Sequence, residues 1–311
     1  MTKFILGRIF WAIVTLLVIL FVLFLLLEFL PGSPFNDERL TTDQITILRE
    51  HYGLNKPFFE KAFIFFLNAI RGDFGISYSI VKNQLVSGIV WSQLGVSVRI
   101  GFQTMVLGSI LGIMLGIIGA TRLHTWKDSA ATVVSVIGVS IPAYVFALLL
   151  SYYIGYRLGW ADLTYSIEHP FRSSILPTLA CSMFVIAQIA RFLRTELIET
   201  LNSDYIQLAR AKGVRSKQII YKHGLRNAII SVITVVGPLM VNLMTGSLVV
   251  EKVFGIPGIG SLLVDAILVK DYNVIVMIAF VYSALYIVVN LLVDILYGVI
   301  DPRIRVAKGG A

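Results

Sequence analysis

The chain has little that would support catalysis or covalent cross-linking. One cysteine, Cys181, and four histidines occur in 311 residues, so an intrachain disulfide and a CxxC metal or redox pair are excluded. Cys181 lies in an apolar run, where a free thiol acts as a small hydrophobic side chain. Walker, HExxH and GxSxG motifs are absent from the sequence. We therefore expect no enzyme activity and no catalytic, cofactor-binding or metal-binding residue in this chain.

Charged residues are scarce as well. They make up 14% of the chain, against about 25% in a typical soluble domain, while 57% of the residues are hydrophobic. So few charges cannot cover a soluble core of this apolarity, and the mean hydropathy of +0.84 predicts a membrane protein. A net charge of +8 can indicate nucleic-acid binding. In a membrane protein, however, the location of the positive charges matters more than their sum, so no nucleic-acid partner is expected.

Long apolar runs are what the sequence has in abundance. About 20 apolar residues cross the hydrocarbon core of a bilayer as a helix, which predicts an all-α integral membrane protein with six transmembrane helices. The first run, in 1–30, has a basic start and lacks an A-x-A-like cleavage site, so it is interpreted as a retained helix and not as a signal peptide. Pro142 predicts a bend in the third span. The other five predicted spans are 96–121, 130–156, 175–191, 228–250 and 274–300.

The segments between the spans indicate the topology. The interval 31–95 has turn signals and charges of both signs, and predicts an extracytoplasmic cap with helices at about 42–51 and 57–70. The positive-inside rule places both termini in the cytoplasm, with 302–311 as a cytoplasmic tail. The two predicted short outer loops hold few of the basic residues, namely Arg157, Arg172, Lys252 and Lys270.

Two features within the spans invite a structural or a functional interpretation. Gly108, Gly112 and Gly116 recur at intervals of four, so they share one helical face where a second helix can approach closely, and helix packing is their expected role. Asp294 lies in the last span and forms a polar stripe with Asn290 and Tyr297. It either pairs within the bundle, the favoured interpretation, or couples an ion in a secondary transporter.

The interval 202–227 is the longest markedly basic and weakly apolar stretch of the chain. Ser203 can cap a short helix in which Tyr205, Leu208 and Ala209 form one apolar face. Gly213 can adopt the left-handed conformation that ends this helix, and a second short helix is expected at about 216–223. Such a pair of helices can fit a groove in a cytoplasmic partner or bind anionic lipid as bulk charge.

The residues of this interval resemble the cytoplasmic "EAA" loop of ATP-binding-cassette (ABC) importer permeases of the peptide/nickel group. The likeness is closest to the first of the two permeases in oligopeptide importers, and it extends to 72–75, 246–247, 251–260, 271–272 and 301–303. Where the loop is named for Glu-Ala-Ala, this chain has Gln207-Leu208-Ala209, so a contact made by that glutamate cannot be carried over. The residues matched to the loop are Asp204, Tyr205, Gln207, Ala209, Arg210, Ala211, Lys212 and Gly213.

The resemblance implies a type I importer permease fold in a bacterial cytoplasmic membrane. It implies four kinds of partner besides the lipid bilayer: a second, similar permease, two cytoplasmic ABC ATPase subunits and an extracytoplasmic peptide-binding protein. ATP and Mg²⁺ would be bound by the ATPase subunits and not by this chain. The implied cargo is an oligopeptide. Dipeptides, nickel or another small solute remain alternatives within the same class of transporter.

Overall fold

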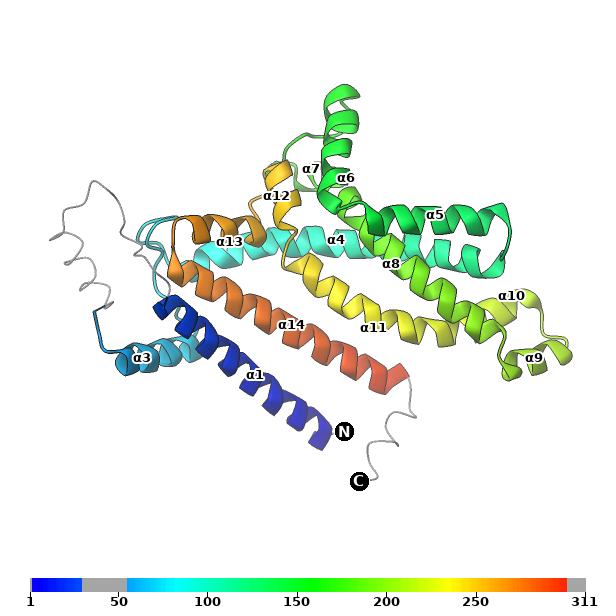
Figure 1. Cartoon of the computed structure of the whole chain (residues 1–311), viewed down its shortest axis with the longest axis horizontal. Helices are drawn as coiled ribbons and strands as arrows, with labels where there is room; N and C mark the ends of the chain where they lie inside the picture. Colours follow the sequence, from blue (N-terminus) through cyan, green and yellow to red (C-terminus); the bar gives the residue numbers. More distant parts are fainter. Residues whose placement is uncertain (1, 30–54, 301–311) are drawn as a thin grey trace. The chain divides into compact units, whose positions relative to one another are not determined.

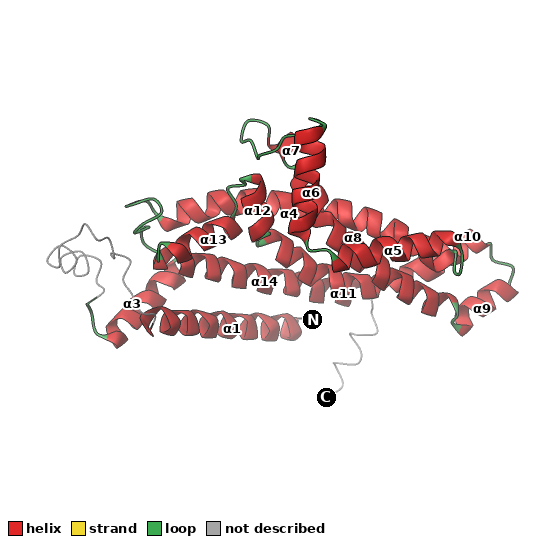
Figure 2. Cartoon of the chain, turned by 45° about the horizontal axis from the view of Figure 1, so that its top comes forward, coloured by secondary structure: helices red, strands yellow, loops and turns green. Residues whose placement is uncertain are grey.

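The computed structural model describes residues 2–29 and 55–300 of the chain. Over these ranges every regular element is a helix, and the only strand-like pairing is an isolated bridge between Ile76 and Leu85 (Figure 2). A helix satisfies its own backbone hydrogen bonds, which the interior of a bilayer requires. The prediction of an all-α membrane protein is therefore confirmed. The cap helix predicted at 42–51 and the tail at 302–311 lie outside the described residues.

Four helices are long and apolar enough to cross a membrane by themselves. Two further pairs of helices reach this length only when each pair is counted as one bent span, with bends of 100° and 63°. Six spans and a cytoplasmic position for both termini thus stay predictions. The four single candidates are Gly7–Leu26, Val86–Thr121, Ile175–Leu201 and Tyr272–Val293.

The described helices divide into two compact units. Unit 1 comprises Met1–Gly95 and Ile259–Ile287. It contains α1 (Thr2–Phe29), α3 (Phe58–Arg71), the start of α4 (Val86–Thr121), α13 (Ile259–Leu268) and most of α14 (Tyr272–Ile300). The helix predicted at 57–70 corresponds to α3, which packs on the last turns of α1. The ring of Phe24 contacts Phe58 and Phe65 there, with centroids 5.5 and 5.3 Å apart.

A buried aspartate joins distant parts of unit 1. The carboxylate of Asp271 accepts hydrogen bonds from the Ser77 hydroxyl at 2.5 Å and from the backbone N–H of Ser79 and Ile80 at 2.9 and 3.1 Å. The side chain of Asn273 donates to the Ile76 carbonyl at 2.9 Å. These bonds fasten the loop after α3 to the start of α14, so the motifs at 72–75 and 271–272 are close neighbours in the fold.

Unit 2 comprises Val96–Gly258 and Val288–Ala311. Its central helix is α8 (Ile175–Leu201), which packs against α5, α6 and α11 (Figure 1). Two apolar clusters surround α8: one combines it with α4 and α11, and the other with α4, α6 and α12. Cys181 is buried in the second cluster, as expected of a small hydrophobic side chain. The remaining elements are α5 (Trp126–Ser140), α6 (Ala143–Leu150), the π-helix η1 (Ser151–Arg157), α7 (Pro170–Ser173), α9 (Asp204–Ala211), α10 (Ser216–Gln218), the π-helix η2 (Ile219–Gly224), α11 (Leu225–Met244) and α12 (Leu248–Phe254).

Helix boundaries differ from the predicted spans in four places. The helix predicted over 130–156 is broken into α5 and the α6–η1 run, which meet at 100°, because Pro142 has no N–H to donate and holds Ile141 in an extended conformation. Similarly, 228–250 is not one helix: α11 ends at Met244, and a turn through Gly246, at φ +84°, leads into α12. Helix α4 begins ten residues before 96, and α8 continues ten residues beyond 191.

Candidate functional site

The interval 202–227, called the basic segment below, begins where α8 ends. Ser203 occupies the N-cap position of α9, but its hydroxyl donates to the Thr200 carbonyl at 2.6 Å. The predicted side-chain cap is therefore wrong, because the hydroxyl instead satisfies a carbonyl at the end of α8. The first N–H groups of α9 bond to the Ser203 carbonyl, with Ile206 and Gln207 both donating at 3.1 Å.

Two side chains of α9 reach back to the end of α8. The Gln207 amide donates to the Asn202 carbonyl and Arg210 donates to the Leu201 carbonyl, both at 3.4 Å. Carbonyls in the last turn of a helix have no hydrogen-bond partner within the helix, so these two side chains supply the donors that the carbonyls at the end of α8 need. A glutamate at position 207 would present an acceptor to the Asn202 carbonyl. The glutamine that departs from the "EAA" pattern thus suits this turn.

Gly213 ends α9 as the sequence predicts. Its φ is +74°, in the left-handed region where a side chain is strained. Gly213 N–H donates to the Arg210 carbonyl at 2.9 Å and Val214 N–H donates to the Ala209 carbonyl at 3.1 Å. This pair of bonds is a Schellman motif, which reverses the chain sharply after Lys212.

The apolar face that the sequence indicates on α9 is not the side that is buried. Ile206 is fully buried, whereas Tyr205 and Leu208 are 43% and 56% exposed and Ala209 is half-buried. A helix this short has apolar residues on two faces, and periodicity alone does not say which face meets the rest of the chain. Ile206 therefore anchors α9, and the face with Tyr205 and Leu208 is left open.

We expect Ile206→Ala to loosen α9 without unfolding the protein. Truncating a fully buried isoleucine costs about 2 to 5 kcal/mol of stability. Each 1.4 kcal/mol raises the fraction of molecules with α9 detached by about a factor of ten. Trypsin should therefore cut the purified permease after Arg210 and Lys212 at least about tenfold faster than it cuts wild type. Leu208→Ala is the matched control, since an exposed side chain should leave the cleavage rate unchanged. Equal rates in the two variants would contradict Ile206 as the anchor.

The second half of the basic segment is not the separate short helix predicted at 216–223. Helices α10, η2 and α11 follow one another without a break, so this stretch is the entry to α11. Asn227, in the first turn of α11, donates through its side-chain amide to the Tyr205 hydroxyl at 2.6 Å. Helix α9 is thus tied to α11 as well as to α8.

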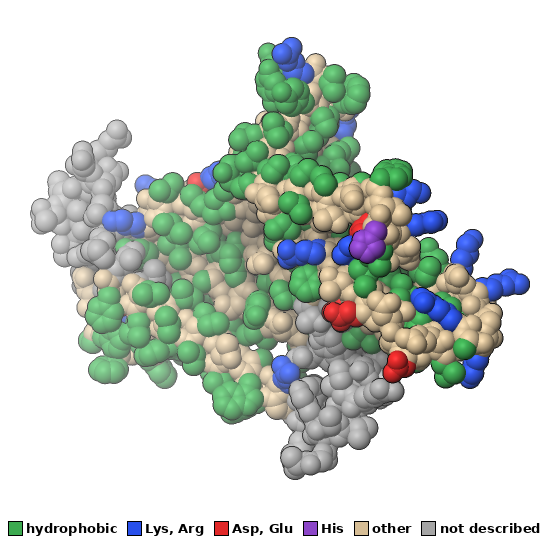
Figure 3. Space-filling view, turned by 45° about the vertical axis from the view of Figure 1, so that its right-hand side comes forward, with side chains coloured by type: hydrophobic (Ala, Val, Ile, Leu, Met, Phe, Trp, Pro, Cys, Tyr) green, Lys and Arg blue, Asp and Glu red, His purple; other side chains and the backbone are tan. Residues whose placement is uncertain are grey.

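Exposed basic residues are concentrated in the chain from the end of α9 onward. Figure 3 shows Lys and Arg side chains gathered at one end of the face in view, while hydrophobic side chains cover most of the remainder. Such a surface favours a partner with acidic groups. The exposed basic residues of the segment include Arg210, Lys212, Arg215, Lys217 and Lys222.

The three glycines of α4 face α8 along its length. A Cβ atom at Gly108 would lie 2.6 Å from the Cβ of Val185, and one at Gly112 would lie 2.9 Å from the Cβ of Ile189. At Gly116 the corresponding distance to the Cβ of Leu193 is 2.9 Å. Each successive glycine thus meets a buried residue one turn further along α8, and the two helix backbones lie too close together for any side chain.

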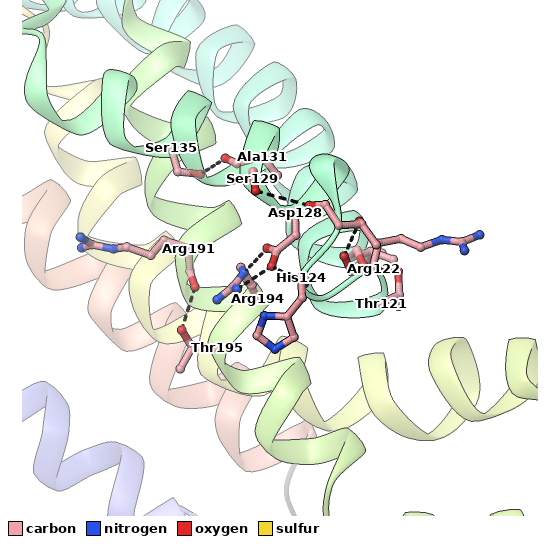
Figure 4. Close-up of polar contacts among 12 residues, drawn as sticks. Thr121, Arg122, His124, Asp128, Ser129, Ala131, Ser135, Arg191, Arg194 and Thr195 are labelled. Atoms are coloured by element: carbon pink, nitrogen blue, oxygen red, sulfur yellow. Dashed lines mark hydrogen bonds and ion pairs between the residues drawn. The ribbon is translucent and has the colours of Figure 1, made fainter.

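An ion pair joins α8 to the start of α5 (Figure 4). Arg194 donates from Nε to Oδ1 of Asp128 at 2.7 Å and from Nη2 to Oδ2 at 3.0 Å. Asp128 is buried and also accepts the backbone N–H of His124 at 3.2 Å. The sequence does not indicate this pair, because Arg194 lies 66 residues from Asp128.

Sequence reasoning also left the buried Glu251 without a role. Its Oε1 accepts the Ser97 hydroxyl at 2.7 Å, which connects α12 to α4. A Cβ at Gly258 would lie 2.3 Å from Oε1 of Glu251, so the glycine-rich turn leaves room for this carboxylate. The sequence feature that could have indicated this contact is a glutamate seven residues before a glycine within the motif at 251–260.

The described residues contain no group of three His, Cys, Asp or Glu side chains placed to hold a metal ion. The side chain of Asp294, for which pairing within the bundle was favoured over ion coupling, lies outside the residues whose side chains the structure describes. The features described above are an exposed short helix, α9, and the packed helical bundle to which it is joined.

This fold is that of an ABC transporter permease. The structure of the MetNI methionine ABC transporter in inward-facing conformations superposes with a TM-score of 0.56, covering 69% of this chain and 97% of that one, at 16% sequence identity. Residues 112–306 match the family described as binding-protein-dependent transport system inner membrane component, and 1–98 match its N-terminal part. The chain belongs to this family.

Full-length relatives support the assignment. The dipeptide transport system permease protein DppB of Lactococcus lactis is 40% identical over 98% of this chain and all of its own length. The oligopeptide transport system permease protein OppB of Escherichia coli is 37% identical, again over 98% of this chain and all of its own length. The predicted location in the bacterial cytoplasmic membrane is confirmed, and the family is a transport component and not a catalytic enzyme.

Proposed function

We propose that the chain is a permease subunit of an ATP-driven importer and forms half of a translocation path for peptides. The observation that carries the proposal is the full-length likeness to permeases named for dipeptide and oligopeptide transport. The second half of the path would come from a similar permease. An external binding protein would deliver the peptide, because the family is named for dependence on such a protein.

Helix α9 would be the contact with the ATPase subunits. Its exposed side presents Tyr205 and Leu208, with the exposed basic residues Arg210 and Lys212 at its C-terminal end, and a short helix of this kind fits an apolar groove with acidic groups at its rim. This proposal requires the basic segment to lie in the cytoplasm, as the distribution of basic residues predicts. ATP and Mg²⁺ would be bound by those partner subunits.

The contacts of α9 would carry ATPase motion into the bundle. Arg210 fastens α9 to the end of α8, the Tyr205–Asn227 bond fastens it to α11, and α9 packs against η2, with Ile206 fully buried. Helix α8 in turn is held to α4 by close backbone packing and to α5 by the Asp128–Arg194 pair. A displacement of α9 would therefore move several helices together as one packed body.

The test is Gly213→Val, with uptake of a labelled oligopeptide and copurification of the ATPase subunits both measured. Valine at φ +74° costs about 1 to 2 kcal/mol and should distort the reversal after α9. We expect uptake to fall at least about tenfold, with weaker ATPase copurification. Wild-type values of both would contradict the coupling role of this turn.

Gly159→Val is the matched control. Gly159 also has a positive φ, +64°, and like Gly213 it has open space where a Cβ would lie. The same strain is thereby introduced in a loop away from the basic segment. We expect this variant to assemble with the ATPase subunits and to transport as wild type does.

A further inference from the structure

Helix α3 carries more apolar surface than its contact with α1 covers. One side of the helix packs on α1 through Phe58 and Phe65, and Ala69 on the same side is buried. A second apolar strip remains open: Phe59, Phe63 and Ile70 are 84%, 69% and 75% exposed. An amphipathic helix docked on a soluble core would cover such a strip, so its exposure requires an explanation.

The open strip is narrow and borders the charged side of the helix. Intervals of four and seven residues place Phe59, Phe63 and Ile70 on one line along the helix. Glu60 and Arg71 lie about 100° further round, and Asn68 and Lys61 lie opposite the strip, so the polar side of α3 borders the strip and is interrupted by Ile64. This arrangement is typical of a helix that lies in a membrane interface with its charged residues toward the headgroups.

The strip continues the lipid-facing surface of α1. Only 11% of the most apolar stretch of α1, within Gly7–Leu26, is buried in the chain. Its exposed residues include Phe21, Val22 and Leu26. The ring of Phe66 stacks on Phe21 at a centroid distance of 6.3 Å, which joins the apolar surface of α3 to that of α1. The surface that must meet hydrocarbon along α1 therefore passes onto α3 without a polar gap.

An ion pair between α3 and α1 indicates where the hydrocarbon of the bilayer ends and the headgroups begin. Lys61 of α3 pairs with Glu28, which follows directly on the apolar run of α1 that ends at Leu26. Charged side chains at the end of a span lie at the headgroup level. The pair thus holds α3 at the depth where acyl chains give way to headgroups, with Arg71 at the C-terminal end of α3 able to reach phosphate groups.

We propose that α3 is an interfacial helix whose strip of Phe59, Phe63 and Ile70 inserts among the acyl chains of the lipid. The occupant of this surface is the bilayer itself and not a second protein. The helix anchors the segment between α1 and α4 to the membrane surface beside α1. The assignment to the outer leaflet rests on the proposed topology, whereas contact with lipid does not.

Site-directed spin labelling of the assembled transporter in lipid nanodiscs tests the proposal. Phe63→Cys and Ile70→Cys are labelled singly in a Cys181→Ala background, and power saturation measures collisions with lipid-soluble oxygen and with water-soluble nickel-EDDA. Glu60→Cys, an exposed position on the polar side of α3, is the matched control. We expect at least about fivefold higher ratios of oxygen to nickel collisions at positions 63 and 70 than at position 60.

Two results would overturn the proposal. If the ratios of oxygen to nickel collisions at positions 63 and 70 were as low as at position 60, water would cover the strip. If the collision rates with both reagents at 63 and 70 were low, protein would cover it. Two labelled sites guard against a variant that fails to fold. Oligopeptide uptake by each variant is measured alongside, so that failure of lipid contact with intact uptake leaves the proposed transport function standing.

Discussion

Replacing Gly108 and Gly112 together with valine should abolish assembly of a stable permease. The Cβ atoms would lie 2.6 Å from Val185 and 2.9 Å from Ile189, and both partners are buried side chains with no free space to retreat into. Helices α4 and α8 would have to separate along the whole contact. Overpacking typically costs about 1 to 3 kcal/mol per site, so the pair should cost on the order of 3 kcal/mol or more.

Intrinsic helix propensity favours the variant over wild type, so it cannot account for a loss of stability. Valine is a better helix former than glycine by a few tenths of a kcal/mol, so any loss must come from packing. Size-exclusion chromatography after stepwise heating measures the surviving complex. We expect most of the monodisperse peak to vanish at temperatures where wild type is intact.

The matched control is Gly95→Val in the same helix. No atom lies within 4 Å of the position that its Cβ would take, so the same substitution adds a side chain without a clash. This variant should keep the chromatographic profile of wild type. If the double variant at 108 and 112 behaved like the control, the close approach of α4 and α8 would be refuted.

Features that depend on local chemistry were predictable from the sequence. The left-handed glycine after α9 follows from a residue type and its place at the end of a helical pattern, and the structure puts Gly213 at φ +74°. The face of α4 that can approach another helix follows from the four-residue spacing of its glycines. Neither inference requires knowledge of which element lies opposite.

Features that depend on the partner element were missed. Pro142 predicts a disturbance, but whether the chain bends slightly or breaks by 100° is decided by the helices packed around it. Likewise, Ile206 and Leu208 are both apolar residues of one short helix, and only the fold decides which is buried. The proposed docking of α9 on a partner requires its second apolar face to stay exposed, and at such a site the rule that apolar residues point inward misleads.

The Asp128–Arg194 pair carries the second large expected effect. Arg194→Asp should place two carboxylates side by side, with Asp128 already buried. Breaking a fully buried pair costs about 3 to 5 kcal/mol, and because the Arg194 side chain is 33% exposed we expect a loss at or below the lower end of that range, about 2 to 3 kcal/mol. The melting temperature of the purified complex and oligopeptide uptake should both fall.

Arg191→Asp provides the matched control, because it makes the same charge change one turn earlier on α8. Arg191 is exposed; its side chain donates to Gln188 at 3.3 Å and lies 6.0 Å from the centroid of the neighbouring Phe192 ring. A surface charge of this kind contributes about 0 to 1 kcal/mol, so the control should melt close to wild type. Equal losses in the two variants would mean that net charge on α8, and not the pair, determines stability.

Exchanging the two residues should restore the complex only in part. In Asp128→Arg/Arg194→Asp the two opposite charges meet again, so the repulsion of the single variant disappears. Arginine at position 128, however, cannot accept the His124 N–H, and it places a positive charge in the first turn of α5, where the helix dipole favours an acid. We therefore expect a melting temperature between those of Arg194→Asp and wild type. Full recovery of the melting temperature would show that Asp128 stabilises the complex through the ion pair alone. No recovery would show that its hydrogen bond to the His124 N–H contributes more than the ion pair.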